Sequence, residues 1–581
     1  MRTRLQIEYL RLLDWSKVAG LIELSEGDNY NFPESLRTDR LVLVAVLAEI
    51  RTLMEDFGEI NGRYAPLKFS EESTARRKVE QLKLAEDFQQ ISTSYERRTA
   101  ERKYPRGLNH IAETASMAKE VVRNPKQLHW VAFDAGIFTK LLGRLTELND
   151  YLAELIRGSQ ARQLEQITQR TYLEMVQVRW SSIEELEHLV TASMLLDDRT
   201  FTSTGRDVRL RNEAILASLA QFKSLNAATD APADHRPCDY ERLLASTYKN
   251  YSQVSYDRMT TSSSYSTTGR VRMKGMFYSS DGSRSDIWIE WQTYKEERVL
   301  NEDKWRPHND STKRVRELVA FLQAPKPPEF CAPECLGYFN DRDDKEQSDH
   351  DFRFRLILKK LEGAGALVSL NQMFDKPTPS LTERKALAHR ISVSILYLHA
   401  VNWWHKGLRS DSIVFFPTKS PTDFSSPRLS GFEYSRPDKE GETTTGGNVN
   451  NWWELYVHPD YQDSGNKGTY RKTFDIYSLG IALLEIAVWT RIENIVGIQD
   501  PEAAETEELK GIRAKLLKPE YLDYVRSNLG DQYHEAGKSY LEGRAAFGID
   551  EAANEAAVKT GAKLQQGFTS RVIDPLGGIS L

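Results

Sequence analysis

Cysteine is scarce in this chain, and long apolar runs are missing from it. Only three cysteines occur among 581 residues, which indicates a reducing compartment and argues against a disulfide-stabilised secreted protein. The longest apolar run, from Leu41 to Ala48, is far shorter than the ~20 residues that a membrane-spanning helix needs. No apolar stretch of signal-peptide length follows the basic start at Arg2 and Arg4. We therefore expect a cytoplasmic protein.

The chain also lacks a surplus of positive charge and a cluster of metal ligands. The formal net charge is −6, so no overall basic field attracts nucleic acid. Cys331 and Cys335 flank Pro333 and have no pair of histidines nearby, whereas a zinc site needs more ligands than two thiolates. We expect no metal site and no nucleic-acid partner.

The length and the apolar periodicity predict a multidomain protein that begins with a helical bundle. A chain of 581 residues is too long for one core. Apolar residues recur at helical spacing over most of the first 195 residues, and such amphipathic helices pack into bundles. The stripes lie at Leu5–Leu13, Leu36–Phe57 and Ile137–Leu152, with Asp134 and Ser182–Glu185 at capping positions.

Two stretches of this helical region resemble a known family. They are Leu10–Trp15 and His129–Asp134, the second followed by Leu148-Asn149-Asp150. Both are similar to the fungal HeLo prion-inhibition-and-propagation domain, which implies a helical module that acts at membranes in programmed cell death. The family's domain opens with an apolar helix before the first motif, and this chain starts almost at that motif. We expect a HeLo-like bundle over residues 1–195 without its first helix. Trp15 and Trp130 are expected to be packing anchors.

The pattern changes after the bundle. Residues 196–254 are predicted to form a linker or stalk with a helix at Asn212–Leu225, and the Ser/Thr-rich stretch Met259–Gly269 to form a mobile loop. Strand periodicity then alternates with one helix before a larger helical region, which predicts an α+β fold of two lobes over residues 255–575. The strands are expected at Val271–Met276, Ile287–Trp291, Cys331–Phe339 and Phe352–Leu358, and the helix at Val315–Leu322.

Motifs in the helical part of this second region resemble protein kinases. Ser380 and Glu383 have capping-box spacing and open an amphipathic helix. Trp403-Trp404-His405 follows that helix, and Asp475 to Gly480 matches the D-x-x-S-x-G helix of kinases. The resemblance implies that Asp475 holds the backbone of the catalytic loop by hydrogen bonds.

The residues that phosphoryl transfer requires are replaced in this chain. In H-R-D-L-x-x-x-N register, Gly407 stands for the catalytic base and Ser412 for the metal-binding asparagine. In the D-F-G register, Gly431 replaces the magnesium-binding aspartate while Phe432 is kept. Asp411 and Glu433 are the acids that could substitute, although a packing or solvated role is favoured for both. The degenerate loop comprises His405, Lys406, Gly407, Arg409 and Ser412.

The region that would bind nucleotide departs from the pattern as well. Glu290 occupies the place of the phosphate-binding lysine, and Lys295 is the alternative residue for that position. Glu317 corresponds to the helix glutamate that would pair with the lysine, or is a solvated helix charge. No G-x-G-x-x-G occurs between Tyr251 and Gly282, so the backbone cannot easily approach phosphates. Pro459 and Asp460 correspond to the structural A-P-E motif.

These departures favour a signalling pseudokinase that regulates the helical effector through a two-state change. An active Ser/Thr kinase that binds ATP and a non-catalytic scaffold are the alternatives. The pattern requires no cofactor; the kinase resemblance would imply ATP with magnesium, and the replaced residues argue against it. Protein partners are expected, and the helical domain could place the chain at a membrane surface.

Overall fold

The chain divides into two compact units, Met1–Gln221 and Phe222–Leu581. The boundary falls inside helix α9 (Thr204–Asp230). In the described residues, no helix is both long and apolar enough to span a bilayer. The computed structural model describes residues 2–19, 43, 46–50, 53, 135–179, 186, 204–230, 259–267, 270–278, 283–294, 296–298, 305–324, 326–340, 353–360, 363–417, 424, 426–432, 435–437, 451–463, 470–500, 504–551, 553–555 and 557–578.

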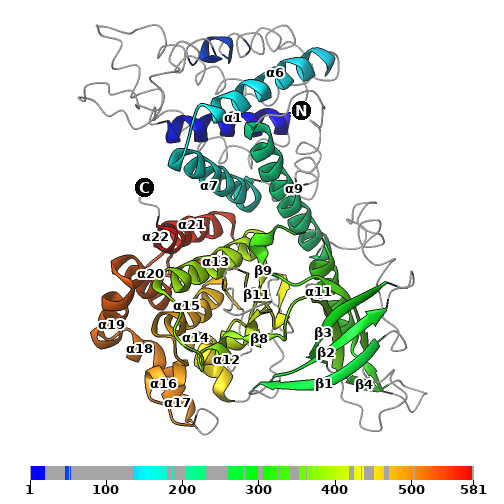
Figure 1. The fold of residues 1–581 in the computed structure, drawn as a ribbon, viewed down its shortest axis with the longest axis vertical. Coiled ribbons are helices and arrows are strands. Elements are labelled where there is room, and N and C mark those ends of the chain that lie inside the picture. Colours follow the sequence, from blue (N-terminus) through cyan, green and yellow to red (C-terminus); the bar gives the residue numbers. More distant parts are fainter. Residues whose placement is uncertain are drawn as a thin grey trace. The chain divides into compact units, whose positions relative to one another are not determined.

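The described part of the first unit is helical, as predicted. Helix α1 (Arg2–Val18) packs against α6 (Ala135–Glu154) and α7 (Ser159–Glu174), which continues into a π-helical turn at Met175–Arg179 (Figure 1). Most leucines of the predicted stripes are buried, among them Leu5, Leu13, Leu145, Leu148 and Leu152, while Leu12 and Leu141 are half-buried.

Some sequence predictions for this unit fall outside the described residues. Of the stripe at Leu36–Phe57, Leu43, Val46–Ile50 and Leu53 are described, and these are helical. Asp134, Ser182–Glu185 and Trp130 lie outside the described residues.

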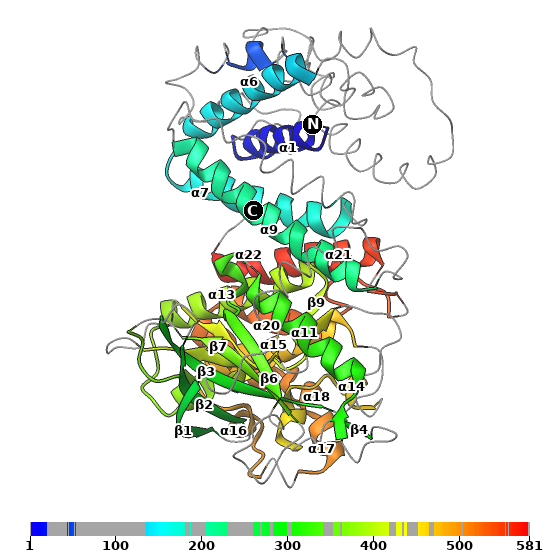
Figure 2. The same cartoon turned by 90° about the vertical axis from the view of Figure 1, so that its right-hand side faces the viewer.

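The second unit contains a five-stranded sheet in the order β1-β2-β3-β7-β6, with every neighbouring pair antiparallel. Ile287, Ile289, Phe339 and Ile357 form its apolar core. Helix α11 packs against β6, and Figure 2 shows the sheet with this helix beside it. The elements are β1 (Met259–Thr267), β2 (Arg270–Tyr278), β3 (Arg284–Thr293), the hairpin β4 (Glu296–Arg298) and β5 (Trp305–Pro307), α11 (Asn309–Gln323), β6 (Cys335–Asn340) and β7 (Arg353–Lys359).

Two predictions about this sheet are wrong. Met259–Gly269 is not a mobile loop, because Met259–Thr267 forms strand β1 and pairs with β2. A strand at the edge of a sheet needs backbone hydrogen bonds on one side and tolerates polar side chains, so its sequence shows no apolar alternation. The strand expected from Cys331 begins only at Cys335, since Cys331 has a left-handed backbone with φ 48°.

Helices α13 (Leu381–Ala400) and α15 (Lys472–Val488) pack against each other in the helical part of the second unit. The capping box that opens α13 is confirmed: Ser380 Oγ accepts from Glu383 N, and the Glu383 carboxylate accepts from Ser380 N at 2.8 Å. A Cβ added to Gly480 would lie 2.4 Å from Tyr540 Cβ, so this position of α15 requires glycine for close approach to α20 (Asp531–Glu542).

The bounds of these helices, with the short strands between them, are as follows. The helices are α12 (Leu370–Met373), α13 (Leu381–Ala400), α14 (Pro459–Asp463), α15 (Lys472–Val488), α16 (Ile492–Val496), α17 (Thr506–Lys510), α18 (Ile512–Leu516), α19 (Pro519–Leu529), α20 (Asp531–Glu542), α21 (Val558–Phe568) and α22 (Asp574–Gly577). The strands β8 (Val368–Ser369), β10 (Ile413–Phe415) and β11 (Arg428–Leu429) form one small sheet, and β9 (Trp403–Trp404) and β12 (Arg436–Pro437) form another.

Helix α9 is longer than the predicted Asn212–Leu225 segment, and its C-terminal part belongs to the core of the second unit. The Phe222 ring centroid lies 5.2 Å from that of Phe321 and 5.4 Å from that of Phe330. Asn226 Nδ2 donates to Val401 O at 2.6 Å. The helix therefore supplies side chains to the cores of both units.

Candidate functional site

Glu290, the residue predicted in place of a phosphate-binding lysine, lies buried on strand β3. Its carboxylate accepts hydrogen bonds from Arg272 Nε at 3.2 Å, Trp288 Nε1 at 3.2 Å and Gly431 N at 3.0 Å. Ser430 Oγ also donates to it. A buried carboxylate with several donors is stabilised in its charged form, and here Arg272 supplies the opposite charge.

Arg272 of strand β2 connects the five-stranded sheet to two loops of the helical part. Its Nη2 donates to Asp411 O at 2.8 Å and to Ser430 Oγ at 2.8 Å. Only 2% of the Arg272 side chain is exposed. We call Arg272, Glu290, Asp411 and Ser430 the Arg272 bridge. Arg272 Nη1 has no hydrogen-bond partner among the described residues, whereas the bonds of Nε and Nη2 join both loops to the sheet.

The predicted catalytic-loop segment is held by Asp475, at the start of α15. The carboxylate oxygens of Asp475 accept from His405 N and Lys406 N, each at 2.8 Å. Tyr470 OH donates to Asp475 at 2.8 Å, and His399 Nε2 lies 3.3 Å from it. Burial opposes charge on this carboxylate, but His399 and the backbone donors hold the pKa of Asp475 below its usual range.

The side chains of this segment serve packing and local hydrogen bonds. Lys406 has φ 60° and its Nζ lies 4.5 Å from the Tyr470 ring centroid, a cation–π contact. Gly407 offers no acid where a catalytic base is expected. Ser412 Oγ accepts from Arg409 N at 2.8 Å and donates to Arg409 O at 2.7 Å. These groups close a tight turn.

Asp411, one of the two acids predicted as possible substitutes for the base missing at Gly407, is buried. Its Oδ1 accepts from Ser369 Oγ at 3.3 Å, while Oδ2 has no hydrogen-bond partner among the described residues. Its backbone carbonyl belongs to the Arg272 bridge. Glu433, the other candidate substitute, lies outside the described residues.

Phe432 belongs to a column of packed rings. Its centroid lies 4.7 Å from that of His405 and 6.3 Å from that of Phe321 on α11. The Phe321 ring stacks on Trp403 at 4.2 Å with an interplanar angle of 7°. Gly431, just before Phe432, adopts φ 82°, which favours glycine. The column connects α11 to the segment that Asp475 holds.

The remaining predicted positions have the following surroundings. The Glu317 carboxylate is buried on α11, 3.8 Å from Lys313 Nζ. Asp460, beside Pro459 in α14, is half exposed and lies 3.7 Å from His458 Nδ1. Lys295 is outside the described side chains. Among the described residues no group of His, Cys, Asp and Glu could hold a metal ion, and Cys331 and Cys335 are free and buried.

Sequence reasoning missed Arg272 and Ser430, the partners of Glu290. In the structure Met273 pairs with Ile289 across β2 and β3, so Arg272 and Glu290 occupy neighbouring cross-strand positions, but the sequence alone does not fix this register. Opposite charges at such positions attract each other. No local pattern marks Ser430, because it lies 140 residues from Glu290 along the chain.

A second buried acid, Glu485 of α15, gives a pH-dependent prediction. Burial raises the pKa of Glu485 to about 8, although hydrogen bonds from Tyr456 OH at 2.7 Å and Ile492 N at 2.9 Å act in the opposite direction. Its Oε2 has no partner among the described residues. The folded protein therefore keeps this carboxyl protonated near neutral pH.

We expect Glu485→Gln to remove part of the decline in the free energy of unfolding of the second unit between pH 4.5 and about 8. Because the folded-state pKa is raised above 4.5 to about 8, the wild-type carboxyl stabilises the fold fully below pH 4.5 and loses this contribution as pH rises to 8. The loss is roughly 1.4 kcal/mol per pH unit in that window. Urea unfolding of both proteins across the window measures it. A parallel decline in wild type and variant would contradict the assignment.

The first unit holds a buried network of opposite charges that sequence reasoning did not find. Glu8 accepts from Arg4 Nη2 at 2.6 Å and from Arg11 Nη1 at 2.7 Å. Arg11 also pairs with Asp150. Arg209 of α9 donates to Asp150 at 3.1 Å and to Glu213 at 3.3 Å, and Glu213 pairs with Arg4 at 2.7 Å. The network connects α1, α6 and α9.

This network explains the two short motifs of the first unit in physical terms. Arg11 of the first motif pairs with Asp150 of the second, and Asn149 Nδ2 donates to Glu8 O at 2.9 Å. Trp15 is 2% exposed, and its indole donates to Leu152 O at 2.7 Å. The motif residues therefore join α1 to α6, and Trp15 is the packing anchor that was predicted.

Comparison with known proteins identifies part of the first unit. Residues 1–189 match the HeLo family model, described as prion-inhibition and propagation. The match confirms the HeLo part of the motif resemblance and suggests an effector role of the fungal cell-death or incompatibility type. No curated protein matches the chain. The kinase resemblance of the second unit stays a prediction.

Proposed function

We propose, with the HeLo match of residues 1–189 as the premise, that the chain is a signalling protein whose second unit is a non-catalytic kinase-like module. That module controls the helical effector in the first unit. A ligand, partner or modification that binds one state of the module better than another would shift the effector between states. Helix α9 supplies side chains to both units, which gives this control a covalent route.

Three features support a kinase-like second unit. An antiparallel sheet with helix α11 precedes the helical part along the chain. Asp475 accepts hydrogen bonds from the backbone of the His405 segment, the role that the resemblance implies for it. Phe432 packs between His405 and the helix that carries Glu317.

The Arg272 bridge is the observation that carries the non-catalytic assignment. A kinase needs a free lysine for phosphates and acids for magnesium. Here Glu290 brings a negative charge to the lysine position, and Arg272 and the Gly431 N–H already neutralise it. Gly407, Ser412 and Gly431 supply no carboxylate for a proton or a metal ion. Loss of a base alone costs about 10²- to 10⁴-fold in rate.

The expected result with nucleotide is no binding and no turnover. Thermal unfolding of the full chain should be unchanged by ATP with magnesium, whereas a ligand at 100 times its dissociation constant would stabilise by about 2.7 kcal/mol. Phosphotransfer to a generic protein substrate should stay at background. Turnover that disappears in an Asp411→Asn variant would establish the active-kinase alternative instead.

The effector half of the proposal predicts a gain of membrane activity when the Arg272 bridge is weakened. We expect Arg272→Ala to raise dye release from anionic vesicles several-fold over wild type, because the kinase-like module would lose its restraining state. Arg316→Ala, an exposed change on α11, is the matched control and should leave release unchanged. Equal release by all three proteins would favour the inert scaffold.

A further inference from the structure

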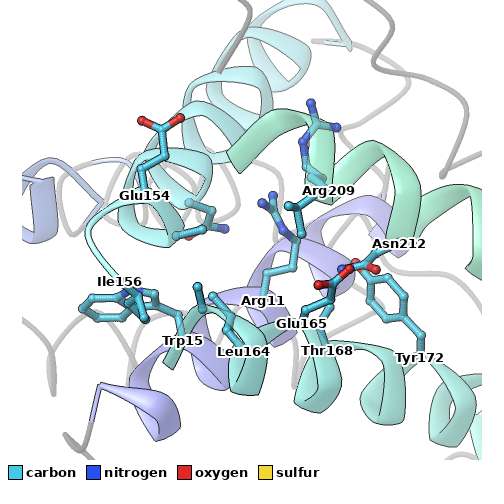
Figure 3. Close-up of a pocket in the computed structure, with 14 residues that line it drawn as sticks. Arg11, Trp15, Glu154, Ile156, Leu164, Glu165, Thr168, Tyr172, Arg209 and Asn212 are labelled. Carbon is cyan, nitrogen blue, oxygen red and sulfur yellow. The ribbon is translucent and has the colours of Figure 1, made fainter. Parts of the chain in front are cut away.

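A cavity of about 560 Å³ lies inside the first unit, between α1, α6, α7 and α9. This is the volume of a small-molecule site. Figure 3 shows its two different ends. Trp15, Ile156 and Leu164 gather at one end, and Arg209, Asn212 and Tyr172 line the other. The cavity is therefore amphipathic, with apolar and hydrogen-bonding walls facing a common space.

Two deeply buried polar atoms of this lining have no partner among the described residues. They are Asn149 Oδ1 and Tyr172 Oη, on side chains whose residues are 4% and 1% exposed. An unsatisfied buried polar atom costs free energy, and native proteins tolerate few of them. Both atoms are sealed from the cavity, so they belong to its wall and not to the surface that would contact a ligand.

The charges around the cavity favour a neutral head group. Arg11 and Arg209 line the cavity, but acids already neutralise both. Arg11 pairs with Asp150 and Glu8. Arg209 pairs with Asp150 and Glu213. The hydrogen bonds of Arg209 to these acids use Nε and Nη1, so Nη2 is available to a ligand oxygen. Two carboxylates, Glu154 and Glu165, also line the cavity, so an anionic head would add a further negative charge beside acids, which is costly in a buried site.

We propose that this cavity binds a neutral amphipathic small molecule. Its head carries hydroxyl or amide oxygens that accept from Arg209 Nη2, and its apolar body packs against Trp15 and Leu164. This site lies within the first unit, so the proposal goes beyond the control of the effector by the second unit and does not depend on it.

Calorimetric titration of the full chain tests the site with a matched pair of probes below their micellar concentrations. Monodecanoylglycerol has a neutral hydroxylated head, and decanoate has the same chain with a carboxylate. We expect saturable binding of monodecanoylglycerol and binding of decanoate weaker by about tenfold or more. Absence of binding by the glycerol ester, or tighter binding of decanoate, would overturn the proposal.

Two alanine variants locate the binding. Ala161 of α7 lines the cavity, so Ala161→Phe should fill it and weaken monodecanoylglycerol binding by about tenfold or more. Ala214 of α9 is exposed, and Ala214→Phe should leave binding unchanged. If Ala161→Phe fails to fold, Ala153→Leu, a smaller change on the α6 wall, takes its place. Unchanged affinity in a folded cavity variant would contradict the assignment.

Discussion

Replacement of Glu8 by glutamine is expected to lower the free energy of unfolding of the first unit by about 3–5 kcal/mol. Glu8 is fully buried and binds both Arg4 and Arg11. The amide of glutamine is neutral, so Arg4 and Arg11 would each lose one of their buried counter-charges. A buried charge without full compensation is among the most destabilising changes known. Urea unfolding, followed by hydrogen exchange of α1 peptides, measures the change in this unit.

The pH dependence of the same variant tests the cause. Burial alone would raise the pKa of Glu8, but the Arg11 and Arg4 guanidiniums hold it at about 2. The wild-type carboxylate therefore stabilises the fold above pH 4.5 and loses its contribution as pH falls toward 2. The difference between wild type and Glu8→Gln should shrink over that range. A deficit that stays constant would mean that packing, not charge, dominates.

Glu147→Gln is the matched control on helix α6. Glu147 is 67% exposed and pairs with Arg144 at 2.8 Å. Exposed pairs contribute about 0–1 kcal/mol because water screens them, so this variant should unfold almost like wild type. A large loss in the control would show that the Glu8 effect does not come from burial.

The comparison of these two glutamates shows what the sequence could and could not predict. Helical spacing in the chain predicts α1 and α6, and both helices form. The pairing of Glu8 with Asn149 joins residues 141 positions apart, and no local pattern encodes such a distance. An Arg and a Glu on a helix face look like solvated charges until tertiary packing buries them.

The second unit gives the same lesson for strands and site residues. Ser380 and Glu383 are three residues apart, so their capping box is predictable and correct. Strand β1 was missed because its Ser/Thr-rich sequence carries no apolar alternation. Glu290 stood out as a lysine replacement, but its role depends on Arg272, whose contacts to Asp411 and Ser430 span 139 and 158 positions.

Glu290→Gln is expected to destabilise the second unit by about 3–5 kcal/mol, since it leaves Arg272 buried without its counter-charge. Loss of the carboxylate also weakens the acceptor for Gly431 N. Urea unfolding with hydrogen exchange of β2 and β3 peptides measures the effect. The control is Glu334→Gln, because Glu334 is 56% exposed and pairs with Lys359 at 3.2 Å. Equal stability of both variants would contradict the buried ion pair.

A double change separates the charge pair from the connection that it makes. Arg272→Met with Glu290→Leu removes both charges at once, so no uncompensated ion remains. Apolar replacement of a buried pair is often neutral or stabilising, and the double variant should therefore lose less stability than the two single changes together. It would still lack the contacts of Arg272 to Asp411 and Ser430. If it keeps wild-type stability but releases vesicle dye as Arg272→Ala does, the bridge serves the proposed restraint of the effector more than it serves folding.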